Sequence, residues 1–315
     1  MFLQGLPNRF KKPNNWLWGH FNNARGKVLR YGQANPFKVP KAHIVYVEGL
    51  GEPAEKTFEL AKEFNQACYN FSALDRYGQG KSERYFEDQP HKQHNEGVDH
   101  DVDDLIQFCK DQIPKNEPIV LLGHSTGGLL ALLALEKEPD LFKAAIVTAP
   151  LFGIKNALIN GKEAFYAKLP LPERALKKYI PRGSDWVARN DPNSHEKADA
   201  YASDPERMLI SDYWPTKDSD LRAGSATVGW VQEMCIAITK LFSKEVIDKI
   251  KHPVLIFSGG EDILVENKNI DQLASQLADA EHHHYKKGKH ELLMETDDIR
   301  ADLMKKSLFF LNRKL

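Results

Sequence analysis

The sequence predicts an α/β fold in which helices cover both faces of a mostly parallel sheet. The first observation is a set of short apolar runs, rich in Val, Ile and Leu, whose lack of polar alternation is typical of strands buried on both faces. These runs span residues 43–47, 118–122, 144–148 and 253–257. The second observation is that helical stretches separate them, at residues 55–65, 102–110, 129–136 and 270–277. Alternating strands and helices indicate a doubly covered sheet.

The last and the middle parts of the chain complete the predicted architecture. Residues 297–311 form an amphipathic helix, because apolar side chains recur there near helical spacing. Between about Phe152 and Ser243 the alternation breaks, and the sequence becomes rich in Pro, Trp, Tyr and charge. An insertion of this length between two strands is most simply a helical cap. We therefore expect a core formed by residues 1–152 and 247–315, with residues 153–246 as the cap.

Composition excludes several classes of protein. The chain has 315 residues, 42% of them hydrophobic and 28% charged, which is typical of a soluble globular protein. Its net charge of −1 gives no reason to expect nucleic acid as a partner. No apolar stretch approaches the roughly 18 residues of a membrane span, and the first residues lack the apolar region of a signal peptide. We expect a cytoplasmic protein and leave peripheral membrane contact open.

The cysteines predict neither a disulfide framework nor a zinc site. Cys68, Cys109 and Cys235 are odd in number, widely spaced and form no C-x-x-C pair. We expect buried, reduced thiols. No metal or other cofactor is expected.

Residues 123–127 read Gly-His-Ser-Thr-Gly, between an apolar run and a helical stretch. This order of strand, G-x-S-x-G and helix is what a nucleophilic serine on a strained, tight turn requires. Gly123 and Gly127 would let strand and helix approach closely, and the helix would aim its first amides at developing negative charge. The alternative is a strand-to-helix turn that happens to contain Ser125.

A nucleophilic serine needs a base and an acid that orients the base. Two carboxylates, Glu261 and Asp262, follow the run at 253–257, where the carboxyl end of a parallel strand places them on the rim of the sheet. A loop aspartate that caps a turn is the alternative. His290 lies in a glycine-bearing loop before the closing helix, and it completes the order Ser, Asp, His.

The other histidines have structural interpretations. His282, His283 and His284 form a run on an expected edge strand, without an acidic or cysteine partner at metal-ligand spacing. His124 is expected to pack inside the serine turn, facing away from the serine. The histidines at positions 91, 94 and 100 lie in a polar stretch, where they could simply be solvated.

An oxyanion hole requires two backbone N–H groups. Thr126 would supply one, because it directly follows the serine. Leu50 is the candidate for the other, since it lies in the loop after the first apolar run, where Gly49 and Gly51 let the backbone turn inward. The alternative is an ordinary glycine-rich turn. A phosphate-binding loop is less favoured, because neither G-x-G-x-x-G nor a P-loop motif follows.

Together these residues resemble the α/β-hydrolase superfamily and, within it, the bacterial lysophospholipase and monoacylglycerol lipase group. The resemblance extends over about residues 31–310. Its further motifs are a turn at 73–82 that is similar to the family's D-R-G-Q-G-x-S turn, and the segments 103–105 and 148–151. Two cap segments add to it, Asp-Pro-Glu-Arg at 204–207 and residues 224–230. The sequence departs from the family at Tyr77, where glycine is usual, at Glu48, where many lipases have histidine, and at Ala226, which replaces proline. The family register favours Asp262 over Glu261.

The resemblance implies the hydrolysis of a carboxylic ester of a mono-acylated lipid, a lysophospholipid or a monoacylglycerol. Ser125 would attack the ester carbonyl, His290 would act as general base and then general acid, and Asp262 would hold the imidazole tautomer. Trp230 and Met234 would bind substrate by lining an acyl-chain pocket, although core packing of the cap is the alternative. The basic, amphipathic residues 165–182 could rest on a lipid surface, or form a solvated cap helix.

Two other functions stay open. A serine aminopeptidase similar to proline iminopeptidase would keep Ser125, Asp262 and His290 and would use cap carboxylates, with Glu206 or Asp212 as candidates, to hold a free amine. A non-catalytic binding protein with a hydrolase fold is the third hypothesis, and the intact set of three residues argues against it.

Overall fold

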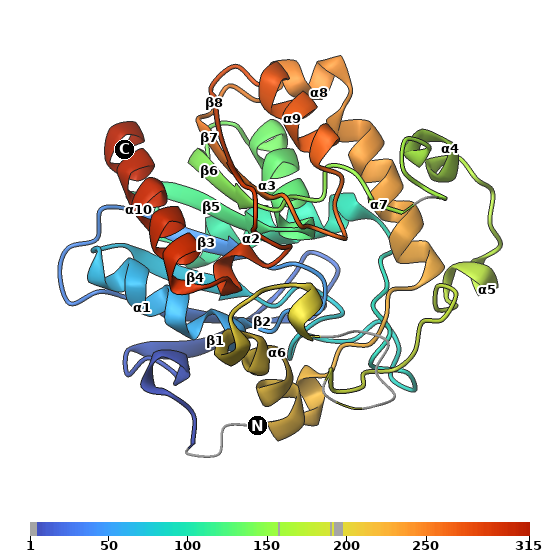
Figure 1. The fold of residues 1–315 in the computed structure, drawn as a ribbon, viewed down its shortest axis with the longest axis horizontal. Coiled ribbons are helices and arrows are strands. Elements are labelled where there is room, and N and C mark those ends of the chain that lie inside the picture. The colour runs from blue at the N-terminus through green and yellow to red at the C-terminus, as the bar shows by residue number, and fades with distance from the viewer. Residues whose placement is uncertain (1–4, 157, 190, 192–197) are drawn as a thin grey trace.

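The computed structural model describes residues 5–156, 158–189, 191 and 198–315, and in these residues eight strands form one sheet in the order β1-β2-β4-β3-β5-β6-β7-β8 (Figure 1). The strands are β1 (Trp16–Asn22), β2 (Val28–Ala34), β3 (His43–Val47), β4 (Asn70–Leu74), β5 (Ile119–His124), β6 (Phe142–Thr148), β7 (Val254–Gly259) and β8 (Ala280–Tyr285). Pairing is parallel from β4 through β8, whereas β1 and β2 join the sheet antiparallel. The mostly parallel sheet that the sequence predicts is confirmed.

Helices cover both faces of the sheet (Figure 1). The covering helices are α1 (Phe58–Gln66), α2 (Val98–Gln112), α3 (Thr126–Lys137), α9 (Asn267–Gln276) and α10 (Asp297–Lys314). Successive residues of β3 show the two sides. Val45 and Val47 pack in a cluster with residues of α2, α3 and α9. Ile44 and Tyr46 pack in a second cluster with residues of α1 and α10. Because side chains alternate along a strand, an unbroken apolar run fills both clusters.

Four strands have no counterpart among the predicted apolar runs: β1, β2, β4 and β8, of which β8 contains the histidine run that is expected on an edge strand. β4 is completely buried, but Asn70 and Ser72 interrupt its apolar sequence. Both polar side chains have partners, since Asn70 donates to Glu117 at 2.7 Å and the Ser72 hydroxyl lies 2.6 Å from Nε2 of His43. Buried polar groups are tolerated when they are hydrogen-bonded, so a buried strand need not be apolar throughout.

The segment between β6 and β7 is helical in its described part. It contains α4 (Glu163–Ala167), α5 (Glu173–Leu176), α6 (Pro205–Lys217), α7 (Val228–Leu241) and α8 (Lys244–Lys249). In Figure 1, α4, α5 and α7 lie on the right of the sheet and α6 lies below it. The expected cap boundary at residue 246 falls within α8, and the division into core and cap stays a prediction.

The cysteines are free thiols in different environments. Cys109 and Cys235 are buried, as expected, but Cys68 is half-buried, so the expectation of three buried thiols is wrong for this residue. Burial raises the pKa of the Cys235 thiol to about 12, which keeps it protonated and unreactive. Among the described residues, no cluster of three His, Cys, Asp or Glu side chains is arranged to hold a metal ion. No helix in these same ranges has the length and apolarity needed to cross a membrane.

His94 is buried, and the expectation that it could be solvated is wrong. Only 8% of its surface is exposed, and its ring packs against Tyr85 and Phe86. Its Nδ1 lies 2.7 Å from the hydroxyl oxygen of Thr227, which also accepts the N–H of Trp230 at the start of α7. Burial, together with nearby lysines, lowers the pKa of His94 to about 4. His94 therefore stays neutral near pH 7, and its Nδ1 shares a hydrogen bond with the hydroxyl group of Thr227.

This environment predicts a loss of stability on acidification. Between pH 6.5 and about 4 the unfolded chain binds a proton at His94 that the folded protein does not. The free energy of unfolding should therefore fall, by up to about 3 kcal/mol, as the pH drops through this window. His94→Asn keeps an acceptor but cannot titrate, so urea unfolding at pH 7 and pH 4 should show a smaller acid-induced loss in this variant. His100→Asn, at an exposed site, is the control. Equal acid-induced losses in wild type and His94→Asn would contradict the prediction.

Candidate active site

Ser125 occupies a strained turn between β5 and α3. Its backbone has φ 51° and ψ −116°, a conformation that costs a non-glycine residue about 1–3 kcal/mol. Backbone hydrogen bonds hold the turn, since the N–H of Ser125 donates to Thr148 at 3.0 Å and its carbonyl accepts the N–H of Leu151 at 2.9 Å. These bonds join the turn to the end of β6. The neighbouring sheet therefore compensates for the strain that presents this side chain.

The glycines of the turn allow the close approach that the sequence predicts. A Cβ atom at Gly127 would lie 1.9 Å from the carbonyl oxygen of Val47, at the end of β3. A Cβ atom at Gly123 would lie 2.4 Å from the carbonyl oxygen of Gly127. Because both obstacles are backbone atoms, they cannot move aside as a flexible side chain would. Only glycine fits either position without a shift of the sheet or of α3.

Asp262 and His290 form a buried hydrogen-bonded pair. Asp262 follows β7, His290 follows β8, and Oδ2 of Asp262 lies 2.8 Å from Nδ1 of His290. The other oxygen of Asp262 accepts the N–H groups of Leu264 and Val265, at 2.7 and 3.0 Å. Burial alone would raise the pKa of Asp262, but the charge and hydrogen bond of His290 and the two N–H groups outweigh it and lower the pKa.

The ionised Asp262 accepts a hydrogen bond from the Nδ1–H group of His290, which leaves Nε2 as the ring nitrogen that can take up a proton. Glu261, the other carboxylate considered from the sequence, is exposed.

The serine turn and this pair lie at the same edge of the sheet, because both are built at the carboxyl ends of parallel strands. The ring of His124, the residue before Ser125, lies 4.9 Å from the ring of His290 between centroids. Nδ1 of His124 lies 3.1 Å from both the carbonyl and the hydroxyl oxygen of Thr148. His124 is thus packed as the sequence predicts, and it also forms part of the wall beside His290.

The two candidate oxyanion donors follow neighbouring parallel strands, β3 and β5. Leu50 is half-buried in the loop after β3, and Thr126 is the first residue of α3. Within the described ranges, neither backbone N–H donates a hydrogen bond to another residue. Gly51 has φ 72°, the left-handed conformation that glycine adopts without strain, so the glycine at this point is what lets the loop turn.

Residues of the turn after β4 hold the loop after β3. Arg76 donates from Nη2 to the carbonyl oxygens of Glu48 and Gly49, at 3.2 and 3.1 Å, and Gln79 accepts the N–H of Gly51. The carboxylate of Glu48 is buried and accepts the N–H of Arg76 at 2.7 Å. Glu48, the departure from the family pattern, therefore ties the loop to Arg76.

A buried ionic cluster beside His124 was missed in the sequence. Nζ of Lys56 lies 2.5 Å from carboxylate oxygens of both Glu52 and Glu291. With His124 and other side chains these three line a cavity of about 20 Å³, enough for roughly one water molecule. The one feature of the sequence that could have indicated this cluster is Glu291, which directly follows the candidate catalytic His290.

The predicted acyl-pocket residues lie on α7 in different environments. Met234 is completely buried in the cluster that includes residues of α3. Trp230 is half-buried and packs against that cluster. Both contacts favour the packing alternative that the sequence left open. Their role in binding substrate stays a prediction.

A doubly covered parallel sheet that presents a strained serine and an Asp–His pair at one edge defines an α/β-hydrolase. The sequence profile of the family described as serine aminopeptidase, S33, matches residues 38–297. The chain belongs to this family, and the protein is an ester hydrolase.

Relatives and solved structures agree with this class. The chain is 26% identical to the probable lysophospholipase L2 of Haemophilus influenzae, over 85% of this chain and 83% of the relative. It is 27% identical to the monoglyceride lipase of Homo sapiens, over 79% of this chain and 74% of the relative. A soluble variant of the monoglyceride lipase from Saccharomyces cerevisiae, in complex with a substrate analog, superposes with a TM-score of 0.73 at 17% identity, covering 96% of each chain. This last likeness shows the fold.

Proposed function

We propose that the protein hydrolyses the carboxylic ester of a mono-acylated lipid, a lysophospholipid or a monoacylglycerol, through an acyl-enzyme on Ser125. The observation that carries the proposal is the 2.8 Å hydrogen bond between Asp262 and His290, in which the His290 ring lies 4.9 Å from the ring of the residue before a serine held in a strained turn. A buried Asp–His pair at the sheet edge that presents a serine has the parts that nucleophilic acyl transfer requires.

Each of the three residues has one role. Oγ of Ser125 attacks the ester carbonyl carbon while Nε2 of His290 takes the hydroxyl proton. The resulting imidazolium then protonates the alcohol as it leaves, and Asp262 stabilises the charged ring through Nδ1. Water attacks the acyl-enzyme by the same route and gives up its proton to His290, and the fatty acid is released with Ser125 restored.

The N–H groups of Leu50 and Thr126 are proposed to bind the oxyanion. Both lack an acceptor among the described residues, so they can donate to the negative oxygen that forms when Ser125 attacks. The contacts of Arg76 and Gln79 preorganise the Leu50 loop for this purpose.

Two observations support a lipid substrate: the names of the relatives, and the exposed surface of the segment that connects β6 to β7. Leu158 and Phe165 in this segment are 70% and 62% exposed, and Lys162 beside them is exposed as well. Apolar side chains among lysines suit contact with a lipid surface. The proposal includes a cytoplasmic protein that contacts the membrane peripherally, and its free thiols favour a reducing compartment.

The aminopeptidase alternative is less favoured because both candidate carboxylates are engaged. Glu206 pairs with Arg9, and Asp212 accepts the backbone N–H of Arg189 at 2.8 Å. A carboxylate committed to an arginine or an amide is a poorer ligand for a free amine.

A substrate panel tests the proposal. Purified protein is assayed with a monoacylglycerol, a lysophospholipid of the same acyl chain and an aminoacyl arylamide, and the released fatty acid or arylamine is measured. We expect kcat/KM for at least one mono-acylated lipid to exceed that for the arylamide by more than about 100-fold. Preferential cleavage of the arylamide would establish the aminopeptidase instead. Absence of hydrolysis, together with no labelling of Ser125 by a fluorophosphonate, would favour the third hypothesis, a non-catalytic binding protein with a hydrolase fold.

A further inference from the structure

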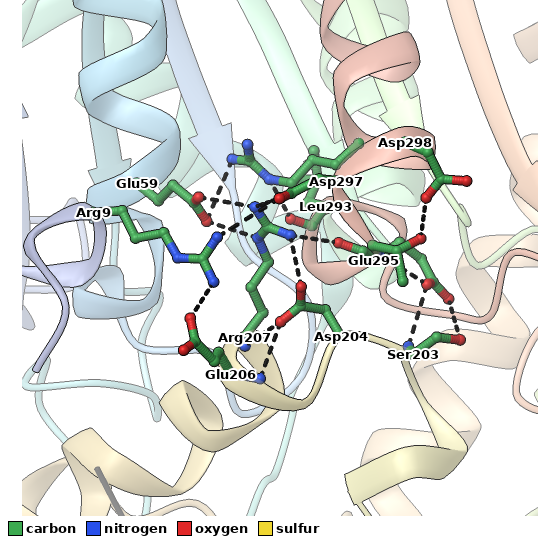
Figure 2. A network of polar contacts seen from close by, with 12 residues as sticks. Arg9, Glu59, Ser203, Asp204, Glu206, Arg207, Leu293, Glu295, Asp297 and Asp298 are labelled. Atoms are coloured by element: carbon green, nitrogen blue, oxygen red, sulfur yellow. Dashed lines mark hydrogen bonds and ion pairs between the residues drawn. The ribbon is translucent and has the colours of Figure 1, made fainter. Parts of the chain in front are cut away.

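Glu295 is a buried carboxylate that joins two distant segments of the chain. It is 0% exposed and lies five residues after His290. One of its oxygens accepts the N–H of Lys289 at 3.0 Å. The other accepts the N–H of Ser203 at 3.2 Å, and Ser203 belongs to the segment between β6 and β7 (Figure 2). One carboxylate thus holds the residue before His290 and the backbone just before α6.

The residue after His290 is held by the same segment. The N–H of Glu291 donates to the carbonyl oxygen of Tyr201 at 2.8 Å. The backbone on both sides of His290 therefore depends on residues 201–203, directly through Tyr201 and indirectly through Glu295. The hydrogen bond to Asp262 holds only the ring of His290.

Arg207, on α6, anchors residues 201–207 to the core. It donates to Glu59 at 2.9 and 3.0 Å, to Asp297 at 2.6 Å and to the carbonyl oxygen of Glu295 at 2.8 Å (Figure 2). Asp204 accepts a further bond from Arg207 at 3.2 Å and also caps the first turn of α6. Arg207 is 2% exposed, and the side chains of Glu59 and Asp204 are largely buried too, so these two contacts are screened less by water and salt than the contact with the exposed Asp297.

We propose that Glu295 is a positioning residue that couples the segment 201–207 to His290. The proposal rests on the proposed function, in which His290 is the general base. Displacement of this segment would remove the acceptor of the Glu291 N–H and the Ser203 N–H that holds the Glu295 carboxylate in place beside Lys289. A shift of about 1 Å in a catalytic group can cost roughly 100-fold in rate. Arg207 keeps the segment in the position that both contacts need.

Glu295→Gln tests the coupling. The amide keeps the size of the carboxylate but replaces one acceptor oxygen with a donor that faces N–H groups. With a soluble short-chain nitrophenyl ester we expect kcat to fall about 10- to 100-fold while KM changes less than about threefold. The rate constant for fluorophosphonate labelling of Ser125 should fall in proportion. A purely structural role would lower the melting temperature without this selective loss of kcat in the folded fraction.

Glu206→Gln is the matched control. Glu206 lies on α6, like Arg207, and the variant removes its ion pair with Arg9. Among the described residues, Glu206 has no hydrogen bond or ion pair to residues 286–296. It should keep kcat within about twofold. If Glu295→Gln does not fold, Arg207→Lys replaces it: a lysine cannot form the forked contacts, and the same selective loss of kcat is expected.

Folded Glu295→Gln with wild-type kcat and labelling rate would overturn the coupling and leave the proposed function intact. A wild-type protein that neither hydrolyses esters nor labels at Ser125 would overturn the proposed function, and the coupling with it.

Discussion

Replacing Ser125 with alanine is expected to lower kcat for ester hydrolysis by about 10⁴- to 10⁶-fold, because the acyl-enzyme can no longer form. The melting temperature should change by only a few degrees, since alanine keeps the Cβ atom and the backbone hydrogen bonds of the turn are unaffected. Fatty acid release and fluorophosphonate labelling, followed by intact mass, measure the effect.

Ser275→Ala is the control for this experiment. Ser275 is exposed on α9, and within the described part of the chain its hydroxyl donates only to the carbonyl oxygen of Gln272, at 2.7 Å. This variant should retain wild-type activity and labelling. Labelling that persists in Ser125→Ala would show that another residue is the nucleophile.

Gly127→Ala is expected to destabilise the protein by at least about 3 kcal/mol, or to prevent its accumulation as folded protein. The added Cβ atom would lie 1.9 Å from the carbonyl oxygen of Val47. Relief of this overlap requires α3 to move away from β3, which would disturb the core on that side of the sheet. Urea unfolding followed by circular dichroism gives the free energy of unfolding.

Gly26→Ala is the matched control for the steric argument. Gly26 has φ 74° and nothing within 4 Å of an added Cβ atom, so alanine there meets only the strain of a left-handed conformation. The expected cost is about 1 kcal/mol. A loss at Gly127 no larger than at Gly26 would contradict the close approach of α3 and β3.

The four strands predicted from apolar runs share one property, which the strands missed in the sequence lack. β3, β5, β6 and β7 are buried on both faces with sequences dominated by Val, Ile, Leu, Phe and Ala, so the apolar run itself predicts them. β4 is equally buried, but the hydrogen bonds of Asn70 and Ser72 to distant residues make its polar side chains tolerable. Those partners are unknown until the chain is folded.

The candidate site was predictable where local sequence constrains the backbone. The order of strand, G-x-S-x-G and helix predicts a strained turn at Ser125, and the observed φ of 51° agrees with it. The choice between Glu261 and Asp262 needed either the family resemblance or the structure, because adjacent carboxylates are equivalent in a local pattern. Burial of Asp262 and its hydrogen bond to His290 distinguish the two.

The class of fold, the serine turn and the order of the three candidate catalytic residues along the chain follow from short runs of neighbouring residues. The burial of His94 and the link that Glu295 makes between Ser203 and Lys289 depend on tertiary packing, since Ser203 and Glu295 are 92 positions apart. Contacts of this kind form only when packing brings distant segments together. Hydrogen-bond partners and burial are properties of the folded molecule, and no local pattern of residues specifies them.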